Sequence, residues 1–131
     1  MKATPVDIAR TFLMLRSRDG DVADPNAERL TVVFQMLSEF SDGGLFASSF
    51  SGYSPWEQHP GDELVLIVEG RTDLILFSEQ GESRNSLSAG QLIVVPAHTW
   101  HRFETFGPVD VLGVTPQPTK TSTEPIPPMD D

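Results

Sequence analysis

Two histidines and two glutamates occur in two short segments of this 131-residue sequence, and together they have the chemistry of a metal site. Glu57 and His59 are two residues apart, so an extended chain places both side chains on one face. A Pro-Gly-Asp turn follows before Glu63, and His101 comes much later. Imidazole and carboxylate ligands suit divalent Fe, Mn, Ni, Zn or Cu, and the absence of cysteine removes thiolate sites. Three or four such ligands would leave coordination positions open for water or substrate.

Each of these residues also has an ordinary interpretation. His59 and His101 fit surface or partly satisfied core histidines, and Glu63 fits a solvated carboxylate at the start of a strand. Glu57 is either a fourth ligand or a hydrogen-bond acceptor that orients one of the imidazoles.

Three residues beside the proposed ligands are predicted to bind substrate. Trp56 and Trp100 either form the apolar wall of a small-molecule site or close one end of the fold. His98 stands in a Pro-Ala-His-Thr-Trp turn, where solvent exposure is expected, with proton transfer as the alternative.

Short apolar segments separated by turn residues predict an all-β fold, an antiparallel sandwich or barrel. The expected strands are 31–37, 45–50, 63–69, 74–77, 92–95, 101–106 and 109–114. Residues 31–37 also show helical spacing, and residues 7–15 fit either a short helix or a strand. Strands 64–68 and 92–95 are apolar on both faces, so the N-terminal segment, a second subunit or a second sheet of the same chain must cover the outer face.

We divide the chain into an N-terminal extension (1–30), a β-barrel domain (31–115) and a Pro-rich tail (116–131). The tail holds five prolines and few large apolar residues, so it is expected to be either flexible or draped along the barrel as an extended strap.

The composition excludes several classes of function. Lys and Arg number 9 against 19 Asp and Glu, and a net charge of -10 opposes binding to nucleic acid or to an anionic membrane. The longest apolar run, 64–68, is far shorter than a bilayer span, and residues 1–10 have no apolar signal core. We therefore expect a cytoplasmic, single-domain protein whose partner is a small-molecule ligand.

The segment around His59 is similar to a known sequence motif: a glycine, five residues, His-any-His, three or four residues, Glu, six residues and a glycine. Here Gly52 lies one residue too far upstream, and Glu57 stands in place of the first histidine. His59, Glu63 and Gly70 follow the pattern. These residues resemble the first motif of the cupins.

The second cupin motif is a glycine, five residues, Pro-any-Gly, two residues, His, three residues and Asn. Gly90, Pro96 and His101 match it in register, whereas His98 replaces the inner glycine and Thr105 the final asparagine. The resemblance covers roughly residues 45–115.

This resemblance implies a cupin-type double-stranded β-helix, or jelly-roll barrel, with a short N-terminal extension, and often a homodimer. It implies metal ligands at Glu57, His59, Glu63 and His101. Dioxygenase, isomerase or decarboxylase chemistry on a small organic molecule is then our first hypothesis. The alternatives are a non-catalytic module that senses a metal or small ligand, and a barrel that binds no metal.

Overall fold

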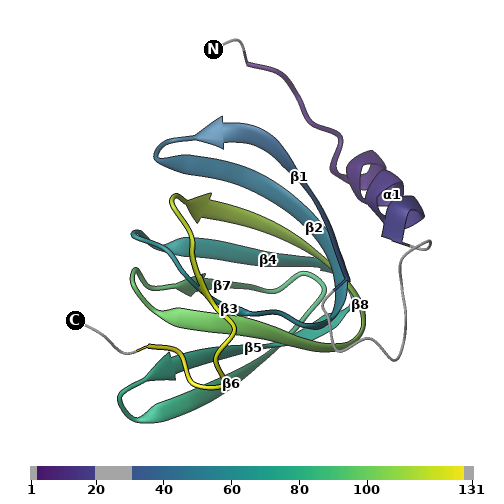
Figure 1. The fold of residues 1–131 in the computed structure, drawn as a ribbon. Coiled ribbons are helices and arrows are strands. Elements are labelled where there is room, and N and C mark those ends of the chain that lie inside the picture. The colour runs from purple at the N-terminus through teal and green to yellow at the C-terminus, as the bar shows by residue number, and fades with distance from the viewer. Residues whose placement is uncertain (1–2, 20–30, 129–131) are drawn as a thin grey trace.

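The computed structural model describes residues 3–19 and 31–128, which form one helix and a strongly curled β-sheet (Figure 1). The elements are α1 (Ile8–Asp19), β1 (Thr31–Phe40), β2 (Gly43–Tyr53), β3 (Trp56–Gln58), β4 (Glu63–Glu69), β5 (Arg71–Ser78), β6 (Gly81–Ser88), β7 (Leu92–Val95), β8 (Trp100–Pro116) and β9 (Lys120–Ser122).

Strand β8 organises the sheet. Its first half pairs with β3 and β5 and its second half with β4, while β2 pairs along most of its length, all antiparallel. β1 extends the sheet beyond β2, β7 beyond β4 and β6 beyond β5. The sheet therefore folds over on itself and encloses a core, as the predicted jelly-roll barrel requires.

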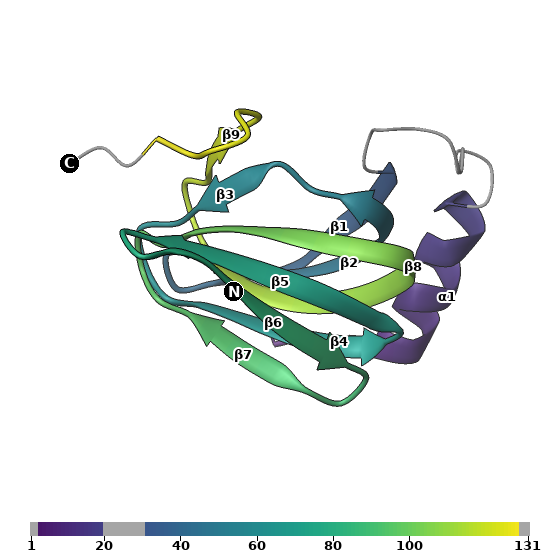
Figure 2. The same cartoon turned by 90° about the horizontal axis from the view of Figure 1, so that it is seen from below.

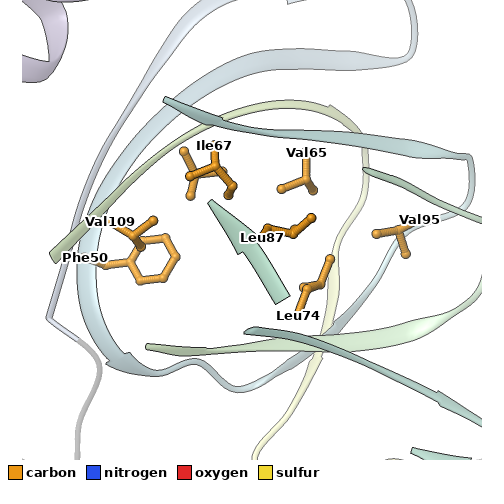
Figure 3. Close-up of a cluster of buried hydrophobic side chains, with 8 residues drawn as sticks. Phe50, Val65, Ile67, Leu74, Leu87, Val95 and Val109 are labelled. Atoms are coloured by element: carbon orange, nitrogen blue, oxygen red, sulfur yellow. The ribbon is translucent and has the colours of Figure 1, made fainter. Parts of the chain in front are cut away.

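The core lies between the two halves of the curled sheet (Figure 3). It is built from the inward positions of alternating strands, which explains why 64–68 contributes Val65 and Ile67 while Leu64 and Leu66 point outward. Its buried members are Phe50, Val65, Ile67, Leu74, Leu87, Val95, Val109 and Val111.

Two predicted strands, 101–106 and 109–114, are in fact the single strand β8. The register with β2 moves from Gly52 opposite Thr105 to Phe50 opposite Val109, which leaves 106–108 without β2 partners. Pro108 has no N–H group, and it lies where β2 needs no hydrogen-bond donor from β8. The strand therefore passes through Pro108 with only a local irregularity.

Strand β6 was missed because its sequence, GESRNSLS, is polar. It is the outer neighbour of β5, and among its residues Leu87 is the buried apolar one. A strand at the edge of a sheet needs few apolar side chains when its partner supplies the hydrogen-bonding ladder.

The N-terminal segment forms a helix, which is one of the two conformations predicted for residues 7–15. Asp7 is the N-cap of α1, since its Oδ1 accepts a hydrogen bond from the Arg10 amide at 2.9 Å. Phe12 and Leu15 are fully buried and pack on Ala47, together with Leu37 and Val68. α1 thus covers part of the outer face of the sheet, beside β1 and β2.

We expect the helix to be held mainly by this apolar contact. Phe12→Ala should lower the free energy of unfolding by about 3 kcal/mol, because it leaves a cavity in a closed cluster. Urea unfolding measures the change. Leu13→Ala, one residue along the same helix but 65% exposed, is the control and should stay within about 0.5 kcal/mol. Equal losses in the two variants would show that α1 does not pack as described.

The described part of the tail lies along the barrel as an extended strap. We call residues 117–128 the C-terminal strap. Its β9 pairs with β3, with Thr121 opposite Glu57 (Figure 2). The indole N–H groups of Trp56 and Trp100 donate to the carbonyls of Pro125 at 3.3 Å and Pro128 at 2.8 Å. The strap therefore lies along the strand that carries Glu57.

No helix among the described residues combines the length and the apolar character needed to cross a bilayer.

Candidate metal centre

Four segments bring the proposed ligands together. Glu57 lies on β3 and His101 on β8, and the two residues are direct partners in the β3–β8 pair. His59 follows β3, and Glu63 begins β4 after the turn. The imidazole rings of His59 and His101 have centroids 5.2 Å apart, so segments distant in sequence meet at one point.

Carboxylate oxygens lie close to both imidazoles. Glu63 places Oε1 3.0 Å from His101 Nε2 and Oε2 3.4 Å from His59 Nε2. Glu57 Oε2 is 3.9 Å from His59 Nε2. One potential ligand atom from each of Glu57, His59 and His101 fits within 4.8 Å of the others. The cluster has the size of a single ion site.

The histidines are buried, whereas Glu57 is partly open. The side chains of His59 and His101 are 2% and 1% exposed, and that of Glu57 is 38% exposed. Burial and the neighbouring carboxylates decide the protonation of the cluster.

Hydrogen bonds at Nδ1 orient both rings. His101 Nδ1 is 2.9 Å from the Thr99 carbonyl, which only accepts, so Nδ1 carries a proton. His59 Nδ1 is 3.0 Å from Thr119 Oγ1, and that hydroxyl donates to Gln117 Oε1 at 3.3 Å. Thr119 is therefore free to accept from His59 Nδ1–H. In the neutral form of each ring, the lone pair is then on Nε2 and points at the cluster.

Both Nε2 atoms are buried without a hydrogen-bond partner among the described residues. Buried polar nitrogens are normally satisfied, and here two of them face the Glu63 carboxylate. Neutral imidazole lone pairs and a carboxylate repel one another unless a proton or a cation lies between them. The donor set therefore fits a divalent ion.

The pKa values of the two glutamates are shifted in opposite directions. Burial opposes ionisation of Glu63, but contacts with His101 and His59 outweigh it and lower its pKa to about 2. Thr115 Oγ1 also donates to Glu63 Oε2 at 2.6 Å. Burial raises the pKa of Glu57. Burial would likewise lower the pKa of His101, yet the Glu63 carboxylate raises it.

A cavity of about 340 Å³ adjoins the cluster. Glu57, His59 and Glu63 lie on its surface, so a molecule in the cavity would meet the candidate site directly. The other lining residues are Phe34, Phe46, Ser48, Phe50, Ser54, Val65, Phe103, Val111, Gly113, Thr115, Gln117 and Thr119.

Trp56, Trp100 and His98 lie elsewhere. Both indoles are buried in a cluster with Ile75 and Phe77, beneath the carbonyls of the strap. His98 is exposed, and its backbone amide donates to the His59 carbonyl at 2.8 Å. None of the three is among the residues that line this cavity, and their part in binding a substrate stays a prediction.

Several residues that shape the site were not singled out from the sequence. Thr115 follows the inward alternation of β8, so the period of two from Val111 was a usable signal. Thr119 gave no such signal, because it reaches His59 from a Pro-rich segment with no periodicity.

We expect Thr119 to set the metal affinity through His59. Thr119→Val removes the acceptor for Nδ1–H and should weaken the binding of divalent ions about 10- to 100-fold, the usual cost of losing an outer partner of a ligating histidine. Thr119→Ser keeps the hydroxyl and should bind as the wild type does. Titration calorimetry with Zn²⁺ measures the affinity, and Thr121→Val, on the exposed part of the same strap, is the control. An unchanged affinity in Thr119→Val would contradict the role of this contact.

Comparison with known proteins finds a family model that matches the part of the chain that carries the candidate ligands. Residues 51–115 match the family model described as a Cupin domain, Cupin_2. This region contains all four candidate ligands. A search of the curated proteins finds no match.

Solved structures share the fold at low sequence identity. A cupin superfamily protein from Desulfitobacterium hafniense is 20% identical, with a TM-score of 0.62 over 88% of this chain and 92% of the other. A cupin-2 domain containing protein from Shewanella frigidimarina is 16% identical, with a TM-score of 0.63 over 86% and 94%. A hydroquinone 1,2-dioxygenase in complex with Cd²⁺ and 4-hydroxybenzonitrile is 19% identical, with a TM-score of 0.55 over 63% of each chain.

Proposed function

Because this chain contains a cupin domain of the Cupin_2 family, we propose that it is a metal-dependent enzyme of dioxygenase or isomerase type acting on a small organic molecule. Glu57, His59, Glu63 and His101 would hold one divalent ion, namely Fe, Mn, Ni, Zn or Cu. The observation that carries the proposal is the pair of buried Nε2 atoms that face the Glu63 carboxylate and make no hydrogen bond within the described part of the chain.

The donor set suits two kinds of chemistry. When bound, a divalent ion supplies Lewis acidity or, as iron, an oxygen-activating centre. Two histidines and one carboxylate are the ligand types of the non-haem iron triad. The proposal is supported by a hydroquinone 1,2-dioxygenase of similar fold that was solved in complex with Cd²⁺.

The two glutamates have separate tasks in this proposal. Glu63, whose pKa is lowered to about 2, stays ionised at neutral pH and balances the ion. Glu57 is partly exposed and lies on the cavity surface, so it is the ligand that a bound molecule would contact most readily.

Oxygen uptake tests the enzymatic part of the proposal. Iron-loaded protein is mixed anaerobically with phenolic, thiol or keto-acid compounds, and consumption is followed after oxygen is admitted. We expect turnover with at least one class, which the metal-free protein lacks. Isomerisation of the same compounds is followed by NMR without oxygen. A protein that binds metal stoichiometrically and turns over none of them would instead support the sensing function.

The homodimer, the cytoplasmic location and the division at residues 30 and 115 remain predictions. Leu92 and Val94 on β7 are 56% and 50% exposed, so the apolar outer face is covered only in part by α1 within the described chain. This exposed pair is where a second subunit would pack, and sedimentation equilibrium measures whether the chain is a dimer.

A further inference from the structure

The cavity has an aromatic wall. Phe50 and Phe103 stack edge-to-face, with centroids 5.2 Å apart, and both belong to or pack against the core. Phe34 and Phe46 line the same cavity from β1 and β2. Phe34 is 64% exposed although it faces a cavity, so its ring is left without burial by the described chain. An apolar ligand would remove this ring from water.

The acidic side chains of the lining are not matched by basic ones. It contains two carboxylates, Glu57 and Glu63, and no lysine or arginine among the described lining residues. Two ionised carboxylates cancel the charge of one divalent ion, so the loaded site would be neutral. An anionic ligand would then enter without a counter-charge, and desolvating it would cost free energy that a neutral ligand does not lose.

We propose that this cavity binds an uncharged molecule built on a single aromatic ring, with the ring against Phe34 and Phe46 and a hydroxyl toward Glu57 and His59. The inference rests on the proposed function and deepens it by naming the ligand class. The size agrees, since a cavity of roughly 150 Å³ already holds benzene and this one has about 340 Å³. Two aromatic rings in edge-to-face or offset contact gain free energy beyond the burial of their area, and a saturated ring lacks this gain.

Three probes of similar size separate the features of this ligand. Phenol is neutral and aromatic, benzoate is anionic and aromatic, and cyclohexanol is neutral and saturated. Their affinities for the zinc-loaded protein are measured by ligand-observed NMR. We expect phenol to bind at least about fivefold more tightly than cyclohexanol, which corresponds to the usual gain from one aromatic contact. Phenol should also bind at least about fivefold more tightly than benzoate, because benzoate must lose the solvation of its charge.

Two variants assign the effect to named residues. Phe34→Ala should weaken phenol binding about fivefold, whereas Phe40→Ala, also exposed on β1 but outside the cavity lining, should leave it unchanged. Glu57→Gln removes one negative charge and should raise the affinity for benzoate relative to phenol. If Phe34→Ala fails to fold, Phe46→Leu repeats the test.

The outcomes distinguish this inference from the proposed function. Zinc content is measured on every sample. A protein that holds no zinc overturns the proposed function. A zinc-loaded protein that binds benzoate or cyclohexanol as tightly as phenol, or in which Phe34→Ala and Phe40→Ala behave alike, overturns the inference alone.

Discussion

His59→Ala/His101→Ala is expected to leave the protein without bound metal. The two imidazoles supply the nitrogen donors of the cluster. Their buried Nε2 atoms make no hydrogen bond within the described residues. Removing both should weaken binding by more than about 100-fold, beyond the range seen when only an outer partner of a ligand is lost. Elemental analysis after growth with added Fe, Mn, Ni, Zn or Cu, and calorimetric titration of the metal-free protein, measure this loss.

The third described histidine provides the control. His98 is exposed and does not line the cavity, so His98→Ala should bind metal as the wild type does. His59→Gln/His101→Gln keeps more of the side-chain volume and separates loss of ligands from loss of packing. Equal metal content in the wild type and the double variants would show that the metal does not bind at His59 and His101.

Metal binding should also stabilise the fold, since an ion that binds only the folded chain shifts the unfolding equilibrium. At an ion concentration 100 times the dissociation constant, the expected gain is about 2.7 kcal/mol, and it should vanish in the double variant.

Trp56→Ala is expected to cause the largest loss of stability, about 4 kcal/mol, because it empties a buried site of the largest side chain. The Trp56 ring is 1% exposed, lies edge-to-face with Phe77 at 5.8 Å and carries the Arg102 guanidinium at 4.6 Å. Its N–H also holds the strap through the Pro125 carbonyl. Urea unfolding followed by circular dichroism measures the loss.

The same substitution should loosen the strap. Trp100 donates to a second strap carbonyl, that of Pro128, so its fluorescence should become more accessible to quenching by acrylamide in Trp56→Ala. Tyr53→Ala is the matched control, because that ring is 49% exposed, and it should cost less than about 1 kcal/mol. A comparable loss in both variants, or unchanged quenching of Trp100, would show that Trp56 does not connect the strap to the barrel.

These two predictions concern one feature, the path from the strap to the candidate metal centre. The strap is anchored at the indoles and reaches His59 through Thr119. Nothing in the local sequence of residues 116–128 indicated these contacts, since prolines remove the periodicity from which burial is inferred.

Strands that are short, continuous apolar runs between turn residues were predictable with their ends. Residues 63–69 and 92–95 form β4 and β7 as expected, because apolar side chains bounded by Gly and Pro leave little choice of conformation. The polar β6 was not predictable, because its strand conformation depends on the ladder with β5. Whether residues 7–15 were helix or strand also depended on tertiary packing, since Phe12 and Leu15 find their partners on the outer face of the sheet.

The amino-acid sequence by itself indicated which residues have the chemistry of a metal ligand, because residue types and their spacing are local properties. It also predicted several of the apolar strands around them. Only the tertiary structure decided that the two imidazoles lie 5.2 Å apart and that Thr99 and Thr119 orient them. It alone placed Phe34 beside the same cavity while removing both indoles from it. Closure of the barrel brings these groups together from distant segments, and no short-range pattern encodes such contacts.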